Sequence, residues 1–254
     1  MPLFNFRLKP TEQIAPWGEQ PNQNLHWFAL TEGEFYIEVG DERLFSYTQQ
    51  VMKYWEMDEK YVDYQIASLA RSILSIYGAA TQPLSKFFTD RFSVWQKFAD
   101  IIADSKDDDY SYEAFRWFGE RSVDTGYFVE CPQIAFYRIG GSINIVWDNR
   151  SRLIDGVPVW AAVFGVYTIS VDDFRRECRD FCGRFLSDME ERINLLASGK
   201  IEGQIDVDIK ALREVHVEWE TELRGYLNDT ENVDVSWSEA EKAFKIVVDR
   251  ISKN

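Results

Sequence analysis

The first pattern along the chain favours β structure. Residues 25–45 (LHWFALTEGEFYIEVGDERLF) are rich in aromatic, isoleucine and valine side chains, which strands prefer. Turn signals interrupt this run at Glu32-Gly33 and again at Gly40-Asp41. The pattern therefore predicts a three-stranded antiparallel meander. The preceding segment, residues 4–21, contains three prolines and is expected to be extended or irregular.

A second β region begins at Ile134. Residues 134–139 alternate between two faces of a strand, and Gly140-Gly141 is a hairpin turn signal. Residues 143–147 continue the alternation on the return strand. We expect a third strand from about Val159 to Ile169, after an intervening loop.

Helical periodicity appears between the two β regions. Apolar side chains recur every three or four residues over residues 62–76 and 88–102, which predicts two helices separated at Gly78 and Pro83. Ser111 is expected to cap a short aromatic helix. The apolar positions are Val62, Ile66, Leu69, Ile73 and Ile76 in the first helix, Phe88, Phe92, Trp95, Phe98 and Ile102 in the second, and Phe115 and Phe118 in the third.

The last third of the chain is predicted to be entirely helical. Ser170 and Asp173 form a start that resembles a capping box, and Gly199 ends that helix. Ser236 and Glu239 form a second capping box. The three apolar stripes are Phe174, Cys178, Phe181, Phe185, Met189 and Ile193; Ile209, Leu212, Val215, Trp219 and Leu223; and Ala240, Phe244, Val247 and Ile251.

These elements predict an α+β fold. Two antiparallel meanders are separated by helices, and no strand–helix–strand alternation typical of a parallel sheet is present. We expect about six to seven helices packed with the meanders in one domain covering residues 1–254. The weakest joints are residues 104–111 and 199–206, and neither is long enough to require a domain boundary.

The net charge of the chain limits the classes of partner that it is expected to bind. The 254 residues carry a net charge of −15, which disfavours direct binding to nucleic acid and docking on anionic membranes. Such a charge keeps a protein soluble or attracts a basic partner. No apolar run is long enough to cross a membrane, and no secretory signal is recognised at the start. Three cysteines without framework spacing favour a reducing, cytoplasmic location.

The residue types that most often carry catalysis or metal binding are sparse. His26 is expected in a strand and His216 on a helix, and packed or surface imidazoles explain both more simply than catalysis. Cys178 and Cys182 share one helix face with the apolar stripe, so we interpret them as buried thiols and not as half of a zinc site. No phosphate-binding, nucleophile or calcium-loop motif is present. We therefore assign no catalytic residue, no metal site and no cofactor.

Glu214, Glu218 and Glu222 form a candidate partner-binding ridge. They repeat every four residues on the predicted helix, opposite its apolar stripe. A solvated helix face explains them most simply, and a contact for basic residues of a partner is the functional alternative.

A second candidate surface is the polar turn after residue 147. Trp147, Asp148 and Arg150, with Trp160 further along, combine residue types that often anchor interfaces. In the simpler alternative, Asp148 and Arg150 pair with each other at a strand end.

Several long motifs resemble an uncharacterised bacterial family, a domain of unknown function. They are FRLKPTEQIAPWG, LHWFALTEGEFYIEVGDERLF and IVWDNRSRLIDGVPVWAAVFGVYTISVDDFRRECRDFC. The resemblance runs from Phe4 to about Ile193. It implies a bacterial cytoplasmic protein, suggests a toxin-neutralising immunity protein, and brings no catalytic residue with it.

We therefore expect a non-enzymatic acidic binding protein. Its specific form would be an immunity-type inhibitor that neutralises a cognate toxin domain, a basic protein partner, by occlusion. One alternative is an enzyme with carboxylate or histidine chemistry in a cleft between sheet and helices, and another is a structural or regulatory subunit. An exposed acidic face would favour binding, whereas a deep pocket with convergent polar side chains would favour catalysis.

Overall fold

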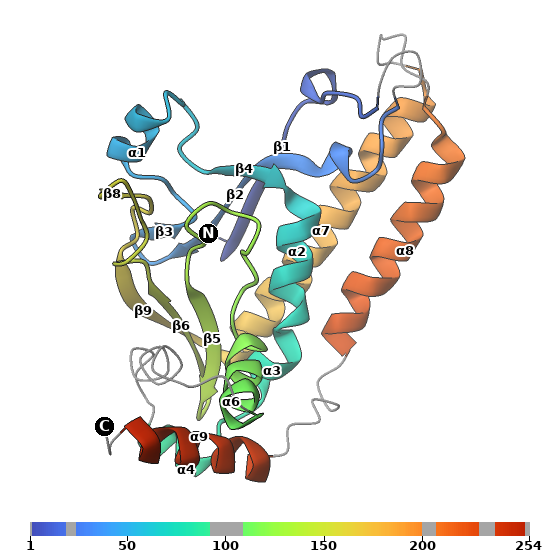
Figure 1. The fold of residues 1–254 in the computed structure, drawn as a ribbon. Coiled ribbons are helices and arrows are strands. Elements are labelled where there is room, and N and C mark those ends of the chain that lie inside the picture. The colour runs from blue at the N-terminus through green and yellow to red at the C-terminus, as the bar shows by residue number, and fades with distance from the viewer. Residues whose placement is uncertain (1, 19–23, 92–108, 200–206, 229–236, 252–254) are drawn as a thin grey trace.

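The computed structural model describes residues 2–18, 24–91, 109–199, 207–228 and 237–251 (Figure 1). These residues form antiparallel sheets packed with helices, and the C-terminal part is helical. The predicted α+β class is confirmed.

The first sheet is built around β2 (Glu32–Val39). One edge of β2 pairs with β1 (Phe4–Leu8), with Phe4 opposite Ile37. Its other edge pairs with β3 (Glu42–Leu44) near one end and with β4 (Val62–Gln65) near the other. All of these pairings are antiparallel.

The first strand predicted in residues 25–45 is wrong. Residues 29–31 form a short 3-10 helix whose side chains are all buried, and His26 lies in the irregular segment before it. The edge of β2 that this strand would have occupied belongs to β1, from the segment expected to be extended or irregular. Leu25 and Trp27 are buried and their neighbours Asn24 and His26 are exposed, which gives the alternation of a strand although this segment is a coil.

The second sheet has the order β5 (Ile134–Ile139), β6 (Ser142–Asp148) and β9 (Phe164–Ser170). The hairpin at Gly140-Gly141 is confirmed, and Gly140 has a φ of +59°. A small hairpin of β7 (Leu153–Ile154) and β8 (Val157–Pro158) interrupts the connection to β9.

The third strand of the second sheet begins at Phe164 and not at Val159. The residues before it pair instead with the segment that follows β3: the Thr48 N–H donates to the Val159 carbonyl at 3.0 Å, and the Ala161 N–H donates to the Ser46 carbonyl at 2.9 Å. Residues 159–161 therefore join the two sheets.

In the part of the chain that the structure describes, five short helices connect the sheets. They differ from the sequence prediction in three places: Val62 belongs to β4, Gly78 lies inside a helix, and the helix around Ser111 begins before this residue, so Ser111 is not its cap. Phe92, Trp95, Phe98 and Ile102 lie outside the described residues. The five helices are α1 (Gln49–Tyr54), α2 (Ile66–Ser75), α3 (Tyr77–Thr81), α4 (Lys86–Arg91) and α6 (Asp109–Gly119).

Three longer helices follow among the described residues: α7 (Val171–Ala197), α8 (Ile209–Asn228) and α9 (Trp237–Ile251). The predicted start of α7 is confirmed, because the Ser170 hydroxyl accepts a hydrogen bond from the Asp173 N–H at 3.0 Å. Every residue of its predicted stripe is buried. Ser236, of the second predicted capping box, lies outside the described residues. Within the described ranges, no helix is long and apolar enough to cross a membrane.

Helix α7 also holds β1 in place. The Leu3 N–H donates to the Glu177 carboxylate at 2.7 Å, and the Arg184 guanidinium donates to the Phe4 carbonyl at 2.6 Å. Further along, Arg192 donates to the carbonyls of Lys9 and Leu30. Side chains of α7 therefore satisfy backbone groups of β1 and its continuation, far away in the sequence.

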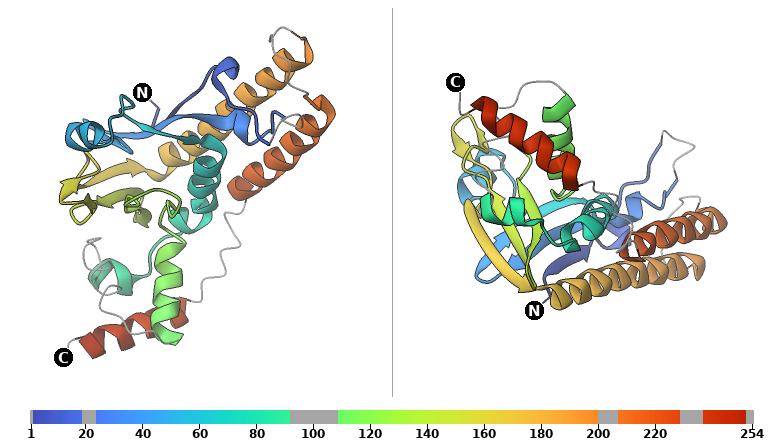
Figure 2. Two further views of the ribbon diagram at one scale, coloured as in Figure 1. Left: turned by 45° about the horizontal axis from the view of Figure 1, so that its top comes forward. Right: turned by 90° about the horizontal axis from the view of Figure 1, so that it is seen from below.

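The buried side chains form two clusters on either side of the second sheet. The larger contains residues of both sheets, α2, α7 and α8. The smaller joins α4, α6 and α9 to Ala135, Tyr137 and Val146, which point to the other face of the sheet. Figure 2 shows α6 and α9 across this sheet from α7. Helix α9 thus packs in the smaller cluster and not in the core shared by α7 and α8.

Candidate binding surfaces

Both histidines contact aromatic side chains. His26 is exposed, and its ring stacks on Trp17 with centroids 5.7 Å apart. Its Nδ1 accepts a hydrogen bond from the Phe28 N–H at 3.2 Å. His216 is half-buried beside Trp27, and burial lowers its pKa, against the opposing charges of Glu220 and Glu190. These contacts place both imidazoles in packing roles.

The paired cysteines lie in the core. Cys178 and Cys182 are fully buried, and burial raises the pKa of both thiols. Cys131 is half-buried, and its Sγ donates to the Phe128 carbonyl at 3.1 Å. Among the described residues, no group of three or more histidine, cysteine or acidic side chains is placed to hold a metal ion. The interpretation of Cys178 and Cys182 as buried thiols agrees with these positions.

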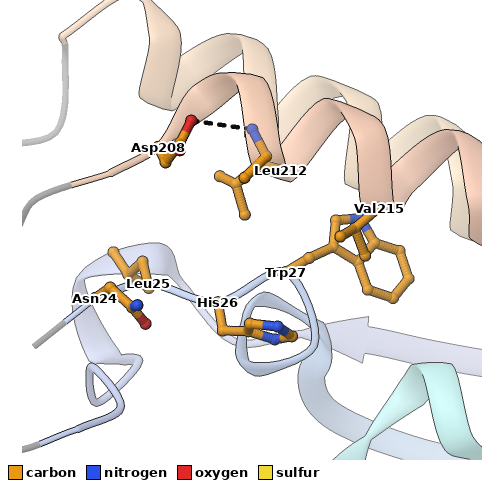
Figure 3. Close-up of a pocket in the computed structure, with 8 residues that line it drawn as sticks. Asn24, Leu25, His26, Trp27, Asp208, Leu212 and Val215 are labelled. Atoms are coloured by element: carbon orange, nitrogen blue, oxygen red, sulfur yellow. Dashed lines mark hydrogen bonds between the residues drawn. The ribbon is translucent and has the colours of Figure 1, made fainter.

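A small cavity of about 100 Å³ lies between the coil before β2 and the start of α8 (Figure 3). Leu25, Trp27 and Leu212 are buried around it. The Asp208 carboxylate accepts a hydrogen bond from the Ala211 N–H at 3.0 Å, as a helix cap does. Ligand pockets usually have about 300–1,000 Å³, so this cavity is a packing seam. Its lining is Asn24, Leu25, His26, Trp27, Asp208, Ala211, Leu212 and Val215.

A larger, charged hollow of about 430 Å³ lies over the outer face of the first sheet. Lys9 contacts Asp63 at 2.5 Å and Glu32 at 3.7 Å, and Arg7 pairs with Glu34 at 2.8 Å. Cations and carboxylates thus meet across β1, β2 and β4. The lining residues are Arg7, Leu8, Lys9, Pro10, Gln13, Glu34, Glu59 and Asp63.

The ammonium group of Lys9 is held in its charged form. Burial opposes the charge, but the hydrogen bond and charge of Asp63, with Glu32 and Glu59, outweigh burial and raise the pKa of Lys9. A lysine with a raised pKa is a poor base or nucleophile at neutral pH, because both roles need the neutral amine. The hollow therefore suits charge recognition better than lysine chemistry.

The segment from β2 to β4, which supplies part of the lining of this hollow, is strongly acidic. Residues 32–63 contain nine acidic and three basic side chains, which gives a net charge of −6. Phe35, Ile37 and Val39 of β2 are buried, so the carboxylates between them face outward. Those outward carboxylates, Glu32, Glu34 and Glu38, all have basic neighbours within 4 Å.

Five further carboxylates in this segment are exposed, and we call them the acidic rim. No ion pair is found for any of them in the part of the chain that the structure describes. Two lie at the β2–β3 turn, and three lie in the loop between α1 and β4. Sequence reasoning missed this surface, because the segment is less acidic than residues 214–241, which carry a net charge of −8. The rim consists of Asp41, Glu42, Glu56, Asp58 and Glu59.

The predicted glutamate ridge on α8 divides into unlike positions. Glu214 is exposed and lies 3.6 Å from Lys210, and Glu218 is exposed. Glu222 is half-buried and pairs with Arg71 of α2 at 2.8 Å. The ridge therefore offers two carboxylates to a partner, while the third connects two helices.

The predicted tryptophan surface lies mostly inside the protein. Trp147 is 4% exposed and Trp160 is 2% exposed, and the Trp160 Nε1–H donates to the Glu130 carbonyl at 2.6 Å. Asp148 pairs with Arg150 at 2.6 Å, and this hydrogen bond, against the effect of burial, lowers the pKa of Asp148. The Arg150 guanidinium also lies 4.5 Å from the ring centroid of Phe164. This geometry favours the simpler alternative, a strand end closed by an ion pair.

Comparison with known protein families identifies the family of this chain. The model of a family of unknown function, DUF5984, matches residues 3–243. The chain belongs to this family. Membership of DUF5984 agrees with the resemblance seen in the sequence motifs, and it brings no reaction or ligand. No curated protein and no solved structure matches the chain.

Proposed function

We propose that this protein is a non-enzymatic binding protein that recognises a basic protein partner through its acidic rim. The observation that carries the proposal is a group of five exposed carboxylates for which the described residues supply no ion pair, in a segment with a net charge of −6. Clustered charge of one sign attracts a partner of opposite charge and speeds its association. Neutralisation of a bacterial toxin domain by occlusion is the specific form of this proposal.

The alternative, an enzyme with carboxylate or histidine chemistry, has less support. No histidine lines the charged hollow, and the lysine there is kept protonated. The two basic residues that line the hollow, Arg7 and Lys9, already contact Glu34 and Asp63. Such paired charges on an open sheet face fit recognition of another charged surface.

The proposal is tested by capturing a partner from the native host and measuring its binding kinetics. Two double variants, Glu56→Lys/Asp58→Lys on the rim and Glu214→Lys/Glu218→Lys on α8, change the net charge equally. We expect the rim variant to slow association by about tenfold or more with little change in dissociation, because exposed charges act on the on-rate. The α8 variant should slow it less, and added salt should reduce the difference.

Two results would contradict the proposal. One is the failure of the host proteome, including any toxin encoded beside the gene, to yield a protein that binds at micromolar concentration. The other is a partner whose association is indifferent to both charge reversals. Asp249→Lys, at an exposed position on α9, controls for reversal at an unrelated site.

A further inference from the structure

Strand β9 forms an open edge of the second sheet. Among the strands in the described ranges, only β6 pairs with it, and Figures 1 and 2 show it outermost of these strands. Its sequence, FGVYTIS, contains no charged residue and no proline. Edge strands usually carry such residues, or a covering element, because an unprotected edge pairs with other chains.

The hydrogen bonds at the two ends of β9 reveal which backbone groups face outward. The Val171 N–H donates to the Gly141 carbonyl, and the Asn149 N–H donates to the Val163 carbonyl. In an antiparallel ladder the bonded residues alternate, so the odd-numbered residues of β9 face β6. The N–H and C=O groups of Phe164, Val166 and Thr168 therefore point to the open edge.

The side chains at this edge are apolar and accessible. Phe164 is 45% exposed and Val166 is 53% exposed, and both lie on one face of the strand. Val146, opposite Val166 on β6, is buried by the smaller cluster. The apolar face of the sheet thus continues from a covered strand onto an uncovered one.

Carboxylates lie near this uncharged strand, as does one guanidinium, that of Arg150, which lies 4.5 Å from the Phe164 ring centroid. The Tyr167 ring lies 3.9 Å from the position that a Cβ atom at Gly40 would occupy, which places the β2–β3 turn and its Asp41 and Glu42 beside β9. Just after the end of β9, the Asp172 side chain is 93% exposed and lies 3.7 Å from Arg175. A second copy of the chain would bring the same carboxylates and the same net charge of −15, so like charges disfavour it.

We propose that β9 binds an extended segment of a basic protein partner, which adds a fourth strand to the second sheet. This inference rests on the proposed function and specifies where and how the partner binds. Backbone hydrogen bonds to Phe164, Val166 and Thr168 supply affinity. Apolar side chains in the segment contact Phe164 and Val166, and basic residues beside them meet the nearby carboxylates.

The test uses the full-length protein and a short synthetic peptide in which valine and threonine alternate between pairs of lysines. Val166→Pro removes one outward N–H and leaves the bonds to β6 untouched. Val166→Thr retains the N–H and is the matched control. We expect the peptide to shift the amide resonances of Phe164, Val166 and Thr168 and to slow their hydrogen exchange. Val166→Pro should weaken binding by about tenfold or more, while Val166→Thr should bind within about threefold of wild type.

Absence of peptide binding at millimolar concentration would overturn the inference, as would equal binding by Val166→Pro. A peptide with a central proline must also lose binding, because it cannot complete the ladder. A wild-type dimer that Val166→Pro dissociates would show that a second copy occupies the edge, and would also overturn it. If Val166→Pro binds the captured partner normally while the rim reversal does not, strand addition fails and the proposed function stands.

Discussion

Glu222 connects α8 to α2 through a stack of side chains. Its carboxylate accepts hydrogen bonds from Arg71 at 2.8 Å and from the Tyr226 hydroxyl at 2.9 Å. The Arg71 guanidinium lies 4.1 Å from the ring centroid of Trp219, and Trp219 stacks on the buried Trp27. The Arg71 hydrogen bond, against a smaller effect of burial, lowers the pKa of Glu222. A carboxylate that looks like surface charge in the sequence therefore supports the packing of α8.

We expect Glu222→Gln to lower the free energy of unfolding by about 1 kcal/mol, a charge-assisted hydrogen bond discounted for solvent screening. Glu218→Gln, one turn away on the same helix, should change it by less than about 0.5 kcal/mol. Because the folded-state pKa of Glu222 lies below its ordinary value of 4.5, the contribution is present above that pH. It is lost as the pH falls through the folded-state value. Denaturant titrations at neutral and acid pH measure both effects, and equal losses from the two variants would contradict the assignment.

Arg121 is a buried cation, and no carboxylate forms a salt bridge with it among the described residues. Its guanidinium donates to the Trp117 carbonyl and to the Gln82 side chain, both at 3.0 Å. It also lies 4.1 Å from the ring centroid of Trp117 and 5.6 Å from that of Trp237. Burial, opposed by the charge of Glu120, lowers the pKa of Arg121 to about 10. One side chain thereby joins α6, the start of α9 and the segment after α3.

At the scale of strands and helices, elements with local sequence signals were predicted well, whereas pairings between remote segments were not predicted. The β5–β6 hairpin and α7 were predicted because turn, cap and apolar stripe all lie within the element itself. The first sheet was mispredicted because β1 comes from a proline-containing segment more than 20 residues before β2. No pattern within that segment indicates which strand it pairs with. The pairing of Glu222 on α8 with Arg71 could not be predicted for the same reason, since Arg71 lies 151 residues away.

Burial of Trp160 gives a second prediction. Its ring stacks on Tyr47 with centroids 5.0 Å apart, and its indole N–H is bonded to the segment before β5. Trp160→Ala should destabilise the protein by about 3–5 kcal/mol, as large-to-small core substitutions do. Trp17→Ala, at a tryptophan that is 42% exposed, should cost about 1 kcal/mol or less. Thermal and denaturant unfolding measure the pair, and a mild effect at Trp160 would mean that it is not a core residue.

At the scale of the whole molecule, the second sheet is shared by both buried clusters. Main-chain bonds also join the segment after α6 to β5: the Phe136 N–H donates to the Arg121 carbonyl at 2.8 Å, and the Val123 N–H donates to the Ile134 carbonyl at 2.9 Å. Strands β5 and β6 thus contribute side chains to both clusters, one on each face of the sheet. The single domain remains a prediction from the sequence, and this sharing is the reason to expect the protein to unfold as one unit.

We therefore expect one cooperative unfolding transition. Circular dichroism and tryptophan fluorescence should give coincident denaturant curves, because a loss of either cluster exposes one face of the second sheet. Ala243→Asp places an uncompensated charge among the buried side chains of α9, and it should lower the midpoint of the whole curve. A separate early transition confined to α9 and α6 would show instead that the smaller cluster unfolds on its own.

The bonds between α7 and β1 set the order in which the protein is completed during synthesis. They join residues 174 to 183 positions apart, and at roughly 5–20 residues per second a ribosome needs about 10–35 s to make the intervening chain. Throughout that interval Phe4 and its strand have no helix to cover them. The nascent chain therefore presents an aromatic strand whose covering helix has not yet been made. We expect chaperones to bind this strand until α7 emerges from the ribosomal tunnel.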